Sequence, residues 1–187
     1  MKKNATIGII GAMMTDEFRL PDWESKRERV DGPADRVVRF DKASRAIAEA
    51  LIRNRTQELG GSGIPVVVEG NRDEDALRAL GFTGPIEKVN RGWDRPRMVA
   101  YLHSEYCIGR THDGGPPVIL LMDWDRTGGR IQASLRERLM AMDSPVDVDL
   151  RNSLLREMKP VGRTVESLLP HVPSLRPMVE RLVSVLE

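Results

Sequence analysis

The sequence predicts an α/β fold in which a mainly parallel sheet is flanked by helices, with an N-terminal extension and a C-terminal helical cap. Two short runs without polar residues carry this prediction, because strands that are buried on both faces are apolar throughout. The runs are IPVVV at 64–68 and VILLM at 118–122, and helical patterns lie between and after them. Such an alternation of strands and helices is typical of parallel sheets.

Length and composition limit the classes of protein to be considered. A chain of 187 residues suffices for one well-buried domain and is short for two. The formal net charge is +1, so attraction to nucleic acid would have to come from a local basic patch. Cys107 is the one cysteine, which excludes an internal disulfide and fits a reducing cytoplasm. No apolar run approaches the roughly 20 residues that span a bilayer, so we predict no membrane partner.

The chain divides into an N-terminal extension at 1–40 and a single α/β domain at 41–187. Within the extension, Ile7 to Met14 is interpreted as a short strand or a loosely packed leader, since no small-residue cleavage site follows it. The segment from Asp16 to Arg39 alternates in charge and contains helix breakers, which predicts a loop or a partly ordered arm.

A helix is expected from Asp41 to Leu59, because small and apolar residues recur on one helical face. The glycine-rich stretch at 60–63 follows this helix, whereas a phosphate-binding loop precedes one, so we interpret the stretch as a helix end and turn. A buried strand is expected at 64–70. Asn71 is expected to be the N-cap of the next helix, with Glu74 completing a capping box and Gly81 ending the helix.

The second half of the domain repeats this alternation. We expect a strand from Pro85 to Val89, a helix from Arg95 to Ile108, and then the apolar strand at 118–122. His103 and Cys107 are four residues apart on that helix, but no further soft ligand is near, so zinc is not predicted.

The C-terminal part of the chain is predicted to be mostly helical. A helix is expected from Arg130 to Met142 and a last strand from Pro145 to Leu150. Short helices interrupted by prolines would follow to Leu186, forming a cap over one face or edge of the sheet.

Carboxylates follow both of the apolar strands. Glu69 comes directly after the first, and Asp123 and Asp125 come directly after the second. The carboxyl ends of parallel strands form the ligand-binding edge of open α/β sheets, so we expect these three side chains to meet there, with Asp73 close to Glu69. Hard carboxylate oxygens suit Mg2+ or Mn2+. A solvated Asp-rich turn is the alternative, but it leaves the position of the acids after the most apolar run unexplained.

Two motifs, VVVEGNRDEDALRALG and ILLMDWDRTGG, together resemble the Toprim family. The glutamate and the first aspartate are 54 positions apart (123 − 69 = 54). The resemblance covers residues 64–149 and implies a Rossmann-like core in which Glu69, Asp123 and Asp125 form the acidic triad. It further implies supporting positions at Gly70, Asp73 and Gly128. Trp124 is bulkier than the residue expected between the aspartates.

The rest of the chain narrows the activities that this resemblance implies. Topoisomerases need a strand-cleaving tyrosine on a separate domain, and both Tyr101 and Tyr106 lie within the Toprim-like span. A primase zinc ribbon cannot be built from one cysteine. The leading hypothesis is metal-dependent phosphodiester cleavage of RNA or DNA by a stand-alone Toprim domain. The metal ligands would be Asp123, Asp125 and Glu69.

In this hypothesis Glu69 is also the general acid or base. Arg126, Arg130 and Arg91 would contact the nucleic-acid backbone, although a solvated surface position explains Arg126 and Arg130 equally well.

Two alternatives remain open from the sequence. One is a non-catalytic Toprim module that binds metal and nucleic acid. The other is a haloacid-dehalogenase-type phosphatase, because DWDRT also satisfies that family's DxDxT signature, with Asp123 as nucleophile. The choice between RNA and DNA, the number of metal ions and the oligomeric state are left open.

Overall fold

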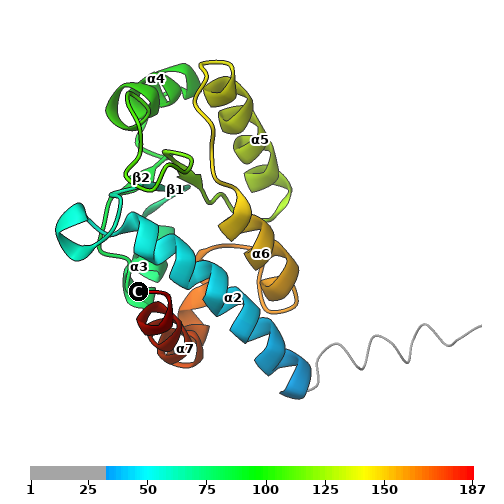
Figure 1. The fold of residues 1–187 in the computed structure, drawn as a ribbon. Coiled ribbons are helices and arrows are strands. Elements are labelled where there is room, and N and C mark those ends of the chain that lie inside the picture. Colours follow the sequence, from blue (N-terminus) through cyan, green and yellow to red (C-terminus); the bar gives the residue numbers. More distant parts are fainter. Residues whose placement is uncertain (1–32) are drawn as a thin grey trace, which may run out of the picture.

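The computed structural model describes residues 33–187 and has a mixed α/β architecture (Figure 1). Its sheet consists of β1 (Val66–Val68), β2 (Ile86–Lys88) and β3 (Ile119–Leu120), all parallel and ordered β2-β1-β3. The parallel sheet flanked by helices is thus confirmed, although it is small. The interpretation of Ile7 to Met14, and most of the predicted extension, lie outside the described residues.

The first described helix, α2 (Pro33–Asn54), begins earlier than predicted. Residues 33–39 are therefore helical, and the prediction of a loop there was wrong. Proline fits the first turn of a helix because its missing N–H would have no intrahelical partner, and Asp35 in the same turn is favoured by the helix dipole. A short 3-10 helix, η2 (Gln57–Leu59), follows, and Gly60 ends it with a positive φ of 76°, as a turn after a helix requires.

Helices cover both faces of the sheet (Figure 1). On one face, α4 (Arg95–Tyr106) and α5 (Arg126–Met140) pack against the buried Val67 and Leu120. On the other, α2 and α3 (Asn71–Leu80) pack against Val66, Val68 and Ile119. Successive strand residues thus face opposite layers, and this is why the strands have to be apolar throughout.

The C-terminal cap is confirmed. It consists of α6 (Asp149–Met158), the 3-10 helix η3 (Glu166–His171) and α7 (Val172–Leu186). Both α6 and α7 pack on α2, as Figure 1 shows, and they bury Leu154, Leu175 and Val179 completely. The apolar faces of these helices therefore complete the core on the α2 side of the sheet.

The predicted strand at 145–150 is reduced to a single parallel bridge between Asp147 and Ile119. Asp147 exchanges two backbone hydrogen bonds with β3, donating to Val118 O at 2.8 Å and accepting from Leu120 N at 2.9 Å. Its carboxylate accepts a hydrogen bond from Asp149 N at 2.8 Å, and helix α6 begins at Asp149. The early start of α6 ends the pairing after one residue, so the prediction of a full strand was wrong.

Among residues 33–187, none of the helices combines the length and the hydrophobicity of a membrane-spanning segment.

Candidate functional site

Two of the three predicted acids meet at the carboxyl ends of β1 and β3. The carboxylate of Glu69 accepts a hydrogen bond from the backbone N–H of Asp123, with 3.1 Å between Oε1 and N. Both side chains, together with Asp73, line an open hollow of about 440 Å³. Its other lining residues are Gly70, Asn71, Arg72, Asn90 and Glu166. The structure therefore brings Glu69, Asp123 and Asp73 together, as the strand order requires.

The start of α3 holds Asp73 in this hollow. Gly70 is the N-cap, and its N–H donates to Asp73 Oδ2 at 2.9 Å. The sequence prediction gave this capping-box role to Glu74, with Asn71 as the cap, and it was wrong by one residue. Because the helix begins at Asn71, its third residue is Asp73, whereas Glu74 forms ion pairs with Lys88 and Arg78 instead.

Asp125 has a capping role at the next helix. It is the N-cap of α5, and its Oδ1 accepts a hydrogen bond from Gly128 N at 2.7 Å. The helix thus begins at Arg126, ahead of the predicted Arg130. Asp125 is exposed and does not line the hollow with the other acids. Its carboxylate is near enough to raise the pKa of both Glu69 and Asp123.

Gly128 is the supporting position where the structure requires the absence of a side chain. A Cβ there would lie 2.2 Å from the carbonyl oxygen of Asp123 and 2.7 Å from Glu69 Oε1. Backbone and carboxylate atoms thus occupy the space that any larger residue needs. At Gly129 the nearest atom to a Cβ would be Arg151 Nη2, at 3.7 Å, which is an ordinary contact. The close packing of the first turn of α5 on the acids therefore depends on Gly128.

The acids raise one another's proton affinity. Burial, followed by the neighbouring charges of Asp73, Glu69 and Asp125, raises the pKa of Asp123 to about 7, although a hydrogen bond from Val165 N at 2.8 Å acts against this. Burial is also the main cause that raises the pKa of Glu69 and of Asp73. A cluster of carboxyl groups with raised pKa values in a hollow is typical of a functional site.

Arg151 is a member of the site that the sequence analysis missed. From α6 it donates through Nε to Met122 O at 2.9 Å and through Nη2 to Asp123 O at 2.8 Å. Burial lowers its pKa, while the charges of Asp123, Glu69 and Asp125 act to raise it. No motif could have revealed it, because only the packing of α6 beside β3 brings this arginine to the acids.

The carboxylates of this site are the kind of ligand that a hard divalent cation prefers, and they lie in a partly buried, negatively charged hollow. Within residues 33–187, however, no three His, Cys, Asp or Glu side chains are grouped closely enough to hold a metal ion as they stand. Glu69, Asp123 and Asp125 each direct one oxygen at a backbone N–H. Joint coordination by all three would therefore require their side chains to move from these positions.

The predicted phosphate-contacting arginines differ in their surroundings. Arg126 and Arg130 are exposed in the first turns of α5, beside the acids. Arg91 is instead partly buried, donates to Lys88 O at 2.8 Å and pairs with Glu87. Arg72, whose side chain is 83% exposed at the rim of the hollow, is a further cation that the sequence analysis did not single out.

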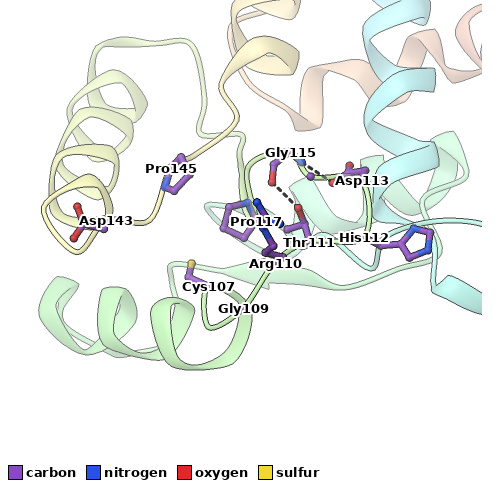
Figure 2. Close-up of a pocket in the computed structure, with 11 residues that line it drawn as sticks. Cys107, Gly109, Arg110, Thr111, His112, Asp113, Gly115, Pro117, Asp143 and Pro145 are labelled. Atoms are coloured by element: carbon purple, nitrogen blue, oxygen red, sulfur yellow. Dashed lines mark hydrogen bonds between the residues drawn. The ribbon is translucent and has the colours of Figure 1, made fainter.

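A larger hollow, of about 630 Å³, lies at the opposite end of β3 (Figure 2). It is formed by the loop between α4 and β3, including Arg110, Thr111 and His112, and by Asp143 and Pro145 after α5. None of the predicted acids lines it. On the adjoining helix, His103 Nδ1 is hydrogen-bonded to Ser144 Oγ at 2.8 Å, and burial raises the pKa of the Cys107 thiol.

The fold and the site together define an α/β protein with a carboxylate cluster at the carboxyl edge of a short parallel sheet. The sequence is 34% identical, over 107 residues, to a UPF0292 protein of Thermoplasma volcanium, covering 57% of this chain and 81% of that protein. A UPF0292 protein of Pyrococcus furiosus is 32% identical over 59% of this chain and 76% of its own. The chain belongs to the UPF0292 family.

Further comparisons add no statement of activity. A UPF0292 protein of Methanosarcina acetivorans is 29% identical over 73% of this chain and 87% of its own. No family model matches the sequence. The similarity to a solved structure of a protein from Aquifex aeolicus covers 73% of this chain and 97% of that one, with 23% sequence identity and a TM-score of 0.43.

Proposed function

We propose that this protein is a metal-dependent phosphodiesterase that cleaves RNA or DNA, built on a Rossmann-like Toprim core. The observation that carries the proposal is the pairing of Glu69 with Asp123 at the carboxyl edge of the sheet, where burial and neighbouring acids raise the pKa of Asp123 to about 7. Such an accumulation of negative charge costs free energy unless a cation accompanies it. The resemblance of both motifs to Toprim proteins supports the same activity.

Mg2+ or Mn2+ would be held by Asp123, Asp125 and Glu69. A bound ion of this kind supplies polarisation of a phosphoryl oxygen and neutralises charge that develops during the reaction. The exposed Arg126 and Arg130 stand beside these acids and would bind and orient the backbone phosphates.

The residues of the chain have separate roles in the proposed hydrolysis. A water molecule attacks phosphorus and forms a new P–O bond, the bond to the leaving oxygen breaks and that oxygen takes a proton from solvent, and the proton of the attacking water must be accepted. Glu69, whose pKa burial raises, is the proposed proton acceptor, since a base works best when its pKa approaches the working pH. Arg151 holds the carbonyl groups of Met122 and Asp123 and thereby fixes the backbone that carries the acids.

The test is a nuclease assay on 5S ribosomal RNA precursors and on single-stranded and duplex DNA, with Mg2+ and with Mn2+. We expect Asp123→Asn and Glu69→Gln each to lower the cleavage rate by about 10²- to 10⁴-fold, the usual contribution of a positioned acid or base. Asp75→Asn, which removes an exposed acid on α3, is the matched control and should cleave as the parent does. Equal cleavage by parent, Asp123→Asn and Glu69→Gln would overturn the catalytic assignment.

A non-catalytic module that binds metal and nucleic acid is the second candidate. The observation in its favour is the exposure of Arg126 and Arg130 beside the acids, since contacts of arginine with backbone phosphates need no catalytic step. Binding of RNA or DNA that depends on Mg2+ but leads to no turnover, in the same assay, would favour the module over the enzyme. The phosphatase alternative has its own test, which is capture of an aspartyl-phosphate at Asp123.

We also propose that the protein works in the cytoplasm, since a single, partly buried cysteine suits a reducing compartment.

A further inference from the structure

A cationic and aromatic cluster lies at the start of α4, where the chain leaves β2. We call it the Trp93 cluster, and it consists of Arg91, Trp93, Arg97 and Tyr101. The guanidinium of Arg91 lies 5.0 Å from the ring centre of Trp93, and that of Arg97 lies 4.5 Å from it. Tyr101 meets the Trp93 ring edge-on, with 5.3 Å between ring centres. The indole is only partly buried, so it is accessible from solvent.

Contacts with Glu87 fix two members of this cluster, Arg91 and Tyr101. Glu87, which is 7% exposed, accepts hydrogen bonds from Tyr101 at 2.9 Å and from Tyr106 at 2.7 Å, and it also pairs with Arg91. Arg91 donates in addition to Lys88 O at 2.8 Å. These bonds hold Arg91 and Tyr101 in place against Trp93, so the ring is a pre-positioned platform.

The side chain of Arg97 has fewer contacts than that of Arg91. Its side chain is exposed, and within the described part of the chain its guanidinium contacts the Trp93 ring without a hydrogen bond or ion pair of its own. An exposed cation–π contact is weak, whereas stacking of a nucleobase on an aromatic ring is the stronger interaction. An unpaired base can therefore replace Arg97 on the ring, and the released guanidinium is then free for a phosphate.

The cluster is next to the acidic hollow. Asn90 lines that hollow and donates its N–H to Glu69 O at 2.9 Å. Trp93 is three positions further along the chain, so their Cα atoms are at most about 11 Å apart. A nucleic-acid strand whose backbone lies over the acids can thus place a neighbouring base at Trp93.

We infer that the Trp93 cluster is a base-stacking subsite that makes a single-stranded segment of nucleic acid the ligand of this edge. Bases within a duplex already stack on both faces, so only an unpaired base can use the ring. Stacking does not depend on the sugar, so single-stranded RNA and DNA share this chemistry. The inference rests on the proposed function for the identity of the ligand class, but it concerns binding and not cleavage.

The test is fluorescence anisotropy with labelled 12-nucleotide oligo(U) and oligo(dT) and a duplex of equal length, with Ca2+ in place of Mg2+ to compensate the acids. Gel electrophoresis after each measurement checks that the strands are intact. We expect the parent to bind the single strands more tightly than the duplex. Trp93→Ala should weaken single-strand binding by roughly 5- to 100-fold and leave duplex binding within about twofold. Trp93→Phe, which keeps a ring, should bind within about threefold of the parent. Arg138→Ala, at an exposed position late in α5, is the control and should not differ.

A second measurement separates stacking from damage to the fold. A 2-aminopurine base in the single strand should lose fluorescence on binding to the parent and to Trp93→Phe, because stacking quenches it. The inference is overturned if the parent does not quench that base, or if Trp93→Ala binds single strands as tightly as the parent does. Stacking at Trp93 in a protein that never cleaves would contradict the proposed function alone, whereas cleavage without stacking would contradict this inference alone.

Discussion

Gly128 and Gly129 occupy neighbouring positions in the first turns of α5 but have different surroundings. Gly128→Ala places a Cβ within 2.2 Å of Asp123 O, so the helix or the acids must shift. We expect a loss of about 1–3 kcal/mol in unfolding free energy and reduced Mg2+ binding, because overpacking strains the backbone that carries Asp123. Denaturant unfolding and calorimetric titration with Mg2+ measure the two effects.

Gly129→Ala is the matched substitution, since the nearest atom would be 3.7 Å from its Cβ. Replacing glycine by alanine within a helix should raise the unfolding free energy by up to about 1 kcal/mol and leave Mg2+ binding unchanged. If both variants behaved alike, the close approach at Gly128 would not matter to the site.

The raised pKa of Asp123 makes stability depend on pH in a definite direction. A carboxyl with a folded-state pKa of about 7 binds its proton more tightly in the folded than in the unfolded protein. The contribution of Asp123 to the free energy of unfolding is therefore most favourable at low pH, and it is lost as the pH rises toward 7. Asp123→Asn removes this loss, so we expect it to raise the melting temperature at pH 8 and to change it little at pH 5.

The expected gain at pH 8 is about 1–2 kcal/mol, a fraction of the full linkage value because solvent screens a half-buried carboxyl. Thermal unfolding without divalent ions measures it, and Asp75→Asn serves as the control at an exposed position. A variant that is less stable than the parent at pH 8 would show that the carboxylate of Asp123 does not carry this electrostatic cost.

At the scale of the elements, Arg53 joins three segments that are distant in sequence. From the end of α2 it donates to Asp113 at 2.6 Å, to Asp147 at 2.5 Å and to Pro116 O at 2.7 Å. Burial acts to raise the pKa of Asp113, but the hydrogen bond and charge of Arg53 lower it to about 2. Arg53 thus fixes both the loop before β3 and the residue that bridges to β3.

Arg53→Ala should lower the unfolding free energy by about 2–4 kcal/mol, because two carboxylates and a carbonyl lose their partner. Arg176→Ala in α7 removes an exposed pair with Glu180 and should cost under about 1 kcal/mol. Urea unfolding at pH 7 compares them. The contribution of Asp113 should itself be lost as the pH falls from about 4 toward 2, and equal effects of the two substitutions would contradict the role of Arg53.

At the scale of the whole molecule, the C-terminal helices are part of the core. Leu175 of α7 is completely buried in the layer that contains α2, whereas Leu186 of the same helix is 43% exposed. Leu175→Ala should lower the unfolding free energy by about 2–5 kcal/mol, and Leu186→Ala should change it by under about 0.5 kcal/mol. Chemical unfolding measures both. Similar values would mean that α7 is not packed as part of the domain.

The sequence predicted the elements whose signal is local. The apolar runs ending at Val68 and Met122 could be recognised as buried strands, because a strand covered on both faces has no polar positions. Because parallel strands have their carboxyl ends at one edge, Glu69 and Asp123 were expected to lie close together, and the structure confirms that they meet. Helix starts were less well predicted, since a shift of one residue moved the capping role from Glu74 to Asp73.

Only the tertiary structure could decide the features that depend on distant packing. Arg151 reaches the acids because α6 packs beside β3, and no pattern near residue 151 indicates this. The anchoring of Arg91 by Glu87 likewise depends on α4 covering the edge strand. The sequence by itself determined that Glu69 and Asp123 meet, because local apolar runs fix the ends of their strands. Tertiary packing decided that Asp125 caps α5 outside the hollow, and burial and neighbouring charge, which exist only once the chain is packed, decided the proton affinity of Asp123.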